Sequence, residues 1–344
     1  MIYVELTLLA ILILIAALIF TNALEHLGAR IGISEGVTGS VFAAVGTAMP
    51  ETMIPILALV FGSASEGETA RQAIGVGAIL GAPLLLSTLA MFLMAVAVVF
   101  SRKPTGIFEP ESSGLRRDLN FFLIAFGVAT AALFMPHSMR WLDFVICAFL
   151  VTLYPVYIWR TVRASSALVE GGHGTEAHNP LLLSRLALPT NMPVILVQVA
   201  IGLAVLVVGV EGFIHSIESL SNRLGISALI LSLLIAPLAS ELPEQVNSIL
   251  WVRRKRDTLA FGNVTGAMVF QGSLLPALGI LMTPWQPTPA ILGSVIATLF
   301  AAAWLRLMLM RGYLRVWQLV LNGTLYAGYI VTVLAPSGWN GQMG

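Results

Sequence analysis

Charged residues are scarce in this chain. Asp, Glu, Lys and Arg make up 10% of its 344 residues, whereas 58% are hydrophobic. A soluble domain carries about 25% charged residues, so the composition excludes a soluble globular protein. The apolar runs are long and continuous, which excludes the alternating strands of a transmembrane barrel. We therefore predict an all-α, polytopic membrane protein.

Cysteine is nearly absent as well. The single Cys147 excludes an internal disulfide and a thiolate metal cluster, and we interpret it as a small packing residue. The net charge of +1 gives no sign of a nucleic-acid partner. The first apolar run starts at Ile2 without a basic segment before it or a small-residue cleavage site after it. We expect it to be a retained helix and not a signal peptide.

Long apolar segments predict about ten transmembrane helices. They lie at 2–22, 35–61, 72–101, 119–136, 141–160, 192–214, 227–251, 258–282, 288–306 and 314–335. A polar stretch separates the fifth from the sixth, and its His173 and His178 are interpreted as solvated loop residues. The predicted organisation is a first five-helix repeat (1–160), a cytoplasmic linker (161–191), a second five-helix repeat (192–335) and a C-terminal tail (336–344).

Basic residues gather on one side of the predicted membrane. Of the 18 Lys and Arg residues, only Arg71, Arg140 and Arg223 fall in loops after even-numbered spans. Cytoplasmic loops are enriched in Lys and Arg, so the basic side is predicted to face the cytoplasm. Both termini then lie outside, and we expect the protein in the cell membrane, in contact with membrane lipids.

Two parts of the sequence resemble each other. When 25–51 is aligned with 218–244 without gaps, nine of the 27 positions are identical, including Pro50 with Pro243 and Glu51 with Glu244. Each half has an odd number of predicted spans, so the second half enters the membrane from the opposite side. The prediction is a 5+5 inverted repeat, and transporters of this kind bind substrate near the midplane, where broken helices meet.

A glutamate marks the centre of each repeat. The stretch 46–51 reads Gly-Thr-Ala-Met-Pro-Glu, and a carboxylate within a membrane helix costs about 2.5–3.5 kcal/mol on insertion scales. Pro50 removes a helix hydrogen bond and crowds the carbonyl of Gly46. Glu51 and Glu244 are therefore candidate ligands of a hard cation. Two facing carboxylates repel each other unless a cation or a proton lies between them.

Other polar residues accompany the two glutamates. Glu241 lies three residues before Glu244, so one helical face holds both. It is a candidate third ligand, a candidate proton carrier, or a residue that turns away to bond a neighbouring helix. Thr47 and Ser240 offer hydroxyl ligands, unless they bond back to their own helices. Asn263 and Gln271 are candidate oxygen ligands or interhelical hydrogen-bonding groups.

The repeated motifs resemble a known family. The stretches 46–51 (Gly-Thr-Ala-Met-Pro-Glu) and 239–244 (Ala-Ser-Glu-Leu-Pro-Glu), each followed by a glycine-marked segment, resemble the alpha-repeat of the cation/calcium exchanger superfamily, which includes sodium/calcium exchangers. In that family the repeat reads Gly-Thr-Ser-Leu-Pro-Glu followed by Gly-Asn-x-x-Gly-Ser-Asn and occurs twice in inverted orientation. By this resemblance, Glu51 and Glu244 match the paired cation-binding glutamates, and Thr47 and Ser240 match the ligand threonines. Gly46 and Ala239 fall in the segments that the family unwinds.

The chain departs from the family pattern in ways that affect ligand number. The family serine is replaced by Ala48 in the first repeat and by Glu241 in the second. The asparagine is Ala78 in the first repeat and Asn263 in the second. The Gly-Ser serines are replaced by Ala82 and Ala267. The polar position four residues after them is Leu86 in the first repeat and Gln271 in the second. We therefore expect fewer ions per cycle, with proton coupling through Glu241 or Glu244.

The resulting hypothesis is a secondary antiporter that exchanges a divalent cation, with calcium as the first choice, for sodium or protons. It is not an enzyme and needs no cofactor; its partners are the transported inorganic cations. One alternative is a membrane-embedded hydrolase of a lipid phosphate. That chemistry needs a basic clamp, and no basic residue lies beside Glu51 or Glu244 within the spans. A transport-inactive relative is the other alternative. Glu25 with Arg30 and Glu218 with Arg223 are expected to form salt links at span ends, and the alternative is that they act as gates.

Overall fold

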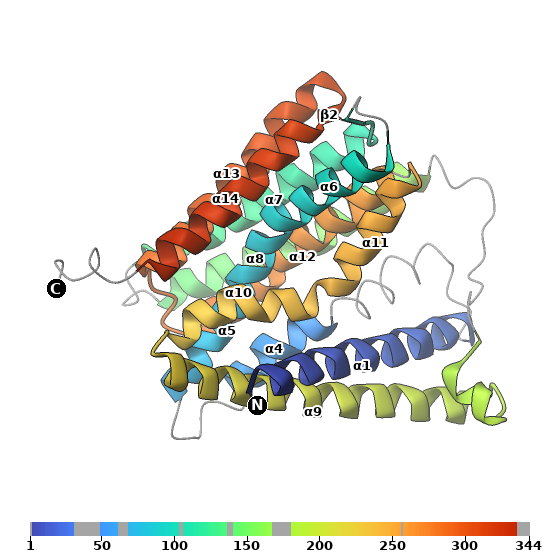
Figure 1. Ribbon diagram of the computed structural model, residues 1–344. Helices are drawn as coiled ribbons and strands as arrows, with labels where there is room; N and C mark the ends of the chain where they lie inside the picture. Colours follow the sequence, from blue (N-terminus) through green and yellow to red (C-terminus); the bar gives the residue numbers. More distant parts are fainter. Residues whose placement is uncertain are drawn as a thin grey trace.

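The computed structural model describes residues 2–30, 49–60, 68–102, 106–135, 140–166, 180–255 and 257–335. This part of the chain is almost entirely helical (Figure 1). The helices of its first half are α1 (Ile2–Arg30), α4 (Met49–Val60), α5 (Glu68–Leu85), the π-helical turn η3 (Leu86–Ala90), α6 (Met91–Ser101), α7 (Ser112–Ala132) and α8 (Arg140–Ser166). Those of its second half are the 3-10 helix η4 (Leu182–Leu186), α9 (Met192–Leu224), α10 (Ala228–Ser240), α11 (Leu242–Arg253), α12 (Asp257–Met282), α13 (Pro289–Met308), η5 (Leu309–Arg311) and α14 (Val316–Leu334).

Seven of the described helical segments are long and apolar enough to cross a membrane, and the bent pair α10–α11 makes a possible eighth. The seven are Ile2–Leu24, Thr69–Ser101, Arg140–Thr161, Met192–Leu224, Asp257–Met282, Pro289–Arg311 and Val316–Leu334. The predicted all-α, multi-pass architecture is therefore confirmed.

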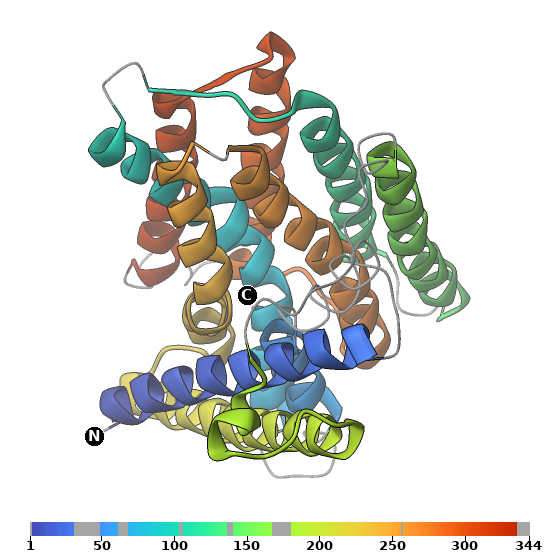
Figure 2. The ribbon, with the colours of Figure 1, turned by 90° about the vertical axis from the view of Figure 1, so that its right-hand side faces the viewer.

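Helices α1 and α9 form a long pair along one edge of the molecule (Figures 1 and 2). Their close approach depends on Gly202, because a Cβ there would lie 2.9 Å from the backbone N and Cα of Phe20. Gln198 of α9 adds two hydrogen bonds to α1, because its Nε2 donates to the carbonyl of Ile19 (3.1 Å) and to Asn22 Oδ1 (2.9 Å). Small residues let helices in a membrane approach closely, and Gly202 has this role here.

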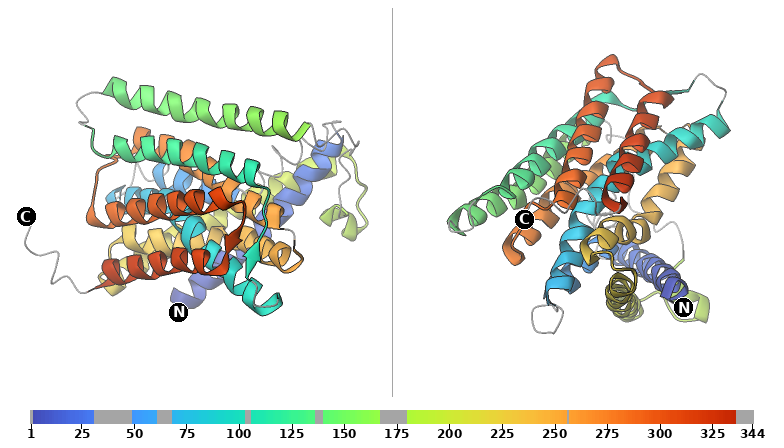
Figure 3. Two further views of the ribbon diagram at one scale, coloured as in Figure 1. Left: turned by 90° about the horizontal axis from the view of Figure 1, so that it is seen from above. Right: turned by 60° about the vertical axis from the view of Figure 1, so that its left-hand side comes forward.

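The remaining helices build a bundle around α5 and α12. Gly77 of α5 faces α10, where a Cβ would lie 2.7 Å from Ser232 Cβ, and Ser232 Oγ donates to the carbonyl of Ile74 (2.7 Å). Helix α12 packs against α7 and α8, which lie side by side at an outer edge (Figures 2 and 3). Cys147 of α8 is buried and donates to the carbonyl of Ala277, as expected for a packing residue.

Loops predicted to share the basic side do lie together. The short strands β1 (Ile107–Phe108) and β2 (Leu314–Arg315) pair in antiparallel fashion, with Phe108 opposite Leu314. Arg102 forms a bidentate ion pair with Asp257 and donates a hydrogen bond to the carbonyl of Val252. These contacts lie at one end of the bundle, where they connect the ends of α6, α11 and α13 with the starts of α7, α12 and α14.

The predicted salt link between Glu218 and Arg223 is wrong. Arg71 of α5 donates to Glu211 of α9 (Nη2 to Oε2, 3.0 Å) and its Nε lies 3.4 Å from Glu218 Oε1. His215 Nδ1 lies 3.7 Å from the other oxygen of Glu218. The side chain of Glu25 lies outside the described part, so the matching link to Arg30 stays a prediction.

Candidate cation site

A break between α10 and α11 creates the centre of the site. Helix α10 ends at Ser240 and α11 begins at Leu242, and the two are bent by 59°. Pro243, in the first turn of α11, has no backbone N–H to continue the hydrogen bonding of α10, so one continuous helix is disfavoured. Glu241 lies at the break with φ −86° and ψ 2°, outside the helical region. Its side chain makes no capping bond to α11.

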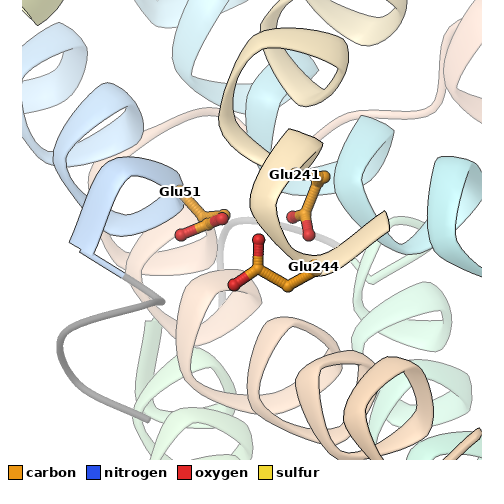
Figure 4. Close-up of side chains that lie close together, drawn as sticks. All are labelled: Glu51, Glu241 and Glu244. Carbon is orange, nitrogen blue, oxygen red and sulfur yellow. The ribbon is translucent and has the colours of Figure 1, made fainter. Parts of the chain in front are cut away.

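Three glutamates from the two halves of the chain converge here (Figure 4). Glu51 comes from the first turn of α4, Glu241 from the break, and Glu244 from the first turn of α11. One carboxylate oxygen from each lies within 4.8 Å of the others. The residues are 4%, 0% and 5% exposed, so three acidic groups are placed together away from solvent.

Most oxygens of this cluster have no hydrogen-bond donor among the described residues. They are both oxygens of Glu51, Oε2 of Glu241 and Oε2 of Glu244. Buried polar atoms without partners are uncommon and need an explanation such as a bound ion. Carboxylate oxygens are the ligands that hard cations prefer, so the arrangement is chemically suited to a calcium-like ion.

The other predicted ligands lie around the cluster with different roles. Gln271 Nε2 donates to Glu241 Oε1 (2.5 Å). Asn263 Nδ2 donates to the carbonyl of Glu244 and to Ser248 Oγ (3.2 Å each). Ser240 Oγ donates back to the carbonyl of Ala236 (3.2 Å), which is the alternative considered for this hydroxyl. Thr47 lies outside the described residues.

Two residues that sequence reasoning missed border the site. Ser248 is buried, accepts from Asn263 and donates to the carbonyl of Ala260 (3.3 Å), which connects α11 to α12. Gln245 is 4% exposed, and its Nε2 has no partner among the described residues. The spacing contained a signal for Ser248, because it lies four residues after Glu244 and shares its helical face.

Comparison with known proteins shows the family of the chain. The family model described as sodium/calcium exchanger protein matches residues 2–163 and 194–335, one match in each half. The chain belongs to this family. The resemblance noted in the sequence is thereby confirmed for both repeats.

Individual members of the sodium/calcium exchanger family and related structures show how far the likeness extends. Inner membrane protein YrbG of Escherichia coli (strain K12) is 26% identical over 258 residues, which cover 75% of this chain and 73% of that protein. The H+/Ca2+ exchanger CAX has a similar structure, with a TM-score of 0.70, 18% identity, and coverage of 97% of this chain and 82% of that one. The sodium-calcium exchanger NCX_Mj gives a TM-score of 0.59 at 19% identity, covering 96% and 99%. These neighbours are exchangers, which are transporters and not enzymes.

Proposed function

We propose that this protein is a secondary cation antiporter that exchanges a divalent cation, calcium in the first instance, for sodium or protons by alternating access. One observation carries the proposal: buried carboxylates from both halves of the chain converge, and most of their oxygens lack a hydrogen-bond partner among the residues that the structure describes. The family match and the exchangers CAX and NCX_Mj support the same class of transport.

The proposed architecture is a 5+5 inverted repeat of ten spans, with repeats at 1–160 and 192–335 and both termini outside. The offset that separates Glu51 from Glu244 also superimposes α4 (Met49–Val60) on α11 (Leu242–Arg253) from end to end, which supports the repeat. The contacts between loops of the basic side support a common cytoplasmic face. The location in the cell membrane belongs to the same proposal.

The cluster also suggests how transport is coupled. Three carboxylates in a buried site repel one another and lose hydration, so an unloaded site is unfavourable. A bound cation compensates this charge with ligands from α4 on one side and α11 on the other. The loaded protein can then change the side to which the site opens, whereas the unloaded protein resists the change. Glu51 and Glu244 are the proposed principal ligands; Glu241, Asn263, Thr47 and Ser240 are proposed further contributors.

Purified protein in proteoliposomes tests the proposal. Vesicles preloaded with sodium, or held at a pH difference, are assayed for calcium uptake. We expect uptake that depends on one of the two gradients and is lost in Glu51→Gln and Glu244→Gln. Glu109→Gln, a change at an exposed loop residue, is the matched control and should transport normally. If folded wild-type protein moves no divalent cation under either gradient, the proposal is wrong.

A further inference from the structure

The pair Glu241–Gln271 places a neutral donor against one member of an acidic cluster. Gln271 lies in the middle of α12, is 2% exposed, and donates through Nε2 to Oε1 of Glu241 at 2.5 Å. Glu241 is fully buried. In this pair the amide nitrogen is the donor and the carboxylate oxygen the acceptor, and the amide oxygen can only accept.

The position of Glu241 explains why such a donor matters. A carboxylate at the start of a helix usually accepts hydrogen bonds from the free N–H groups of the first turn. Glu241 immediately precedes α11 but makes no such bond. Its own helices therefore do not fix the direction of its side chain, and within the described residues the donor that does so comes from α12.

The chemistry of the donor preserves the charge of its partner. A lysine or arginine in place of Gln271 would neutralise the charge of Glu241, and the site would then offer less negative charge to a cation. An amide holds one oxygen and leaves the net charge unchanged. The other oxygen of Glu241, Oε2, has no hydrogen-bond partner within the described part of the chain and belongs to the cluster with Glu51 and Glu244. The amide oxygen of Gln271 is likewise buried without a partner among these residues.

We propose that Gln271 is a positioning residue that holds Glu241 as the third carboxylate ligand of the transported cation. This inference rests on the proposed function and assigns Gln271 a role that acts through Glu241. The second half of the chain then contributes two carboxylates to the cation, Glu244 and Glu241, instead of Glu244 alone.

A double-mutant cycle on the full-length protein tests the inference. The affinity for calcium is measured by a calcium-dependent thermal shift in detergent, for wild type, Gln271→Met, Glu241→Gln and the double variant. A hydrogen bond to a charged group supports a loss of affinity of about tenfold for Gln271→Met. In the Glu241→Gln background the same change should alter the affinity by less than about twofold, because the two residues act as one unit. Equal losses in both backgrounds, or no loss in either, would overturn the inference.

Transport kinetics and a control separate this role from packing. Gln271→Met should raise the KM for calcium uptake and keep the maximal rate. Gln318→Met removes another buried glutamine, one in α14 that accepts a hydrogen bond from the N–H of Arg315, and should leave the affinity unchanged. If Gln271→Met folds poorly, the exchanged pair Glu241→Gln with Gln271→Glu keeps one carboxylate and one amide in contact. It should bind calcium more tightly than Glu241→Gln alone, and failure to do so contradicts the inference.

The wild-type measurements distinguish the two levels of failure. Absence of both a calcium-dependent shift and uptake in folded wild-type protein would contradict the proposed function. Normal wild-type behaviour with an additive cycle would contradict only the role of Gln271.

Discussion

Glu218 of α9 is paired with Arg71 of α5, and not with Arg223 of its own helix. Residues five positions apart on a helix do not face each other, whereas residues three or four apart do. Arg71 instead lies between Glu211 and Glu218, which are two helical turns apart on one face of α9. The contact joins the first half of the chain to the second.

Removing Arg71 should lower stability modestly. Arg71→Met leaves Glu211 and Glu218 without their cation, and since all three side chains keep some solvent contact the loss should be about 1 kcal/mol. The thermal midpoint in detergent measures it, and high salt should reduce the difference from wild type. Arg223→Met, at an exposed position of the same helix end, is the control. An equal loss in both variants would argue against the pairing.

Arg102→Gln should be far more damaging. Asp257 is 6% exposed and accepts from the Arg102 guanidinium and from the N–H of Glu109 (3.0 Å). Removing one partner of a buried pair leaves a buried charge, at a cost of about 3–5 kcal/mol. A thermal or denaturant series on the purified protein tests this. Arg253→Gln, at an exposed residue of the same side, should be nearly neutral.

The start of α7 should give a pH-dependent contribution. Glu111 accepts hydrogen bonds from the Ser113 hydroxyl and from the N–H groups of Gly114 and Ser113, which lower its pKa from the ordinary value of about 4.5. A lowered pKa means that the ionised carboxylate stabilises the folded state fully at pH values above the ordinary pKa. This contribution is lost as the pH falls through the lowered pKa. Glu111→Ala should cost about 1 kcal/mol at neutral pH.

The pH series provides the check on this capping role. The difference in thermal midpoint between wild type and Glu111→Ala should narrow as the pH falls below the ordinary glutamate pKa of about 4.5. A Glu111→Ala difference that is constant with pH would show that packing, and not the charged cap, stabilises α7.

Two glycines in helices should respond in opposite ways to alanine. Gly202→Ala places a methyl 2.9 Å from the backbone of Phe20, so α1 and α9 must separate, at a cost of about 1–3 kcal/mol. At Gly127 of α7, no atom of the described residues lies within 4 Å of an added Cβ, and alanine there should be neutral or slightly stabilising. Thermal midpoints of the two variants, compared side by side, test this reading of the α1–α9 contact.

The sequence predicted the helices more accurately than their ends. The span 192–214 begins with α9 at Met192, where Asn191 caps the helix through Val194 N, but α9 continues to Leu224. Hydropathy falls where charged residues begin, whereas the helix ends only where Gly225 adopts a φ of 65°. The apolar pattern predicts which part of a helix can lie in a membrane, whereas the C-terminal cap determines the residue at which the helix ends.

Side-chain partners were harder to predict than the place of the site. The alignment of the two repeats indicated that Glu51 and Glu244 would meet, and the structure brings them together with Glu241. That they bind a cation stays a prediction. The donors that surround them depend on distances between helices, so the bonds from Gln271 to Glu241 and from Asn263 to Ser248 could not be derived from spacing.

The cluster of Glu51, Glu241 and Glu244 contains an odd number of acidic groups, one from the first half and two from the second. A homodimer of two identical half-length proteins would place an even number at its axis, two from copies of the first half or four from copies of the second. Three requires both halves to be present and to differ. Splitting this chain between the two halves and pairing either half with itself would therefore not rebuild the same site.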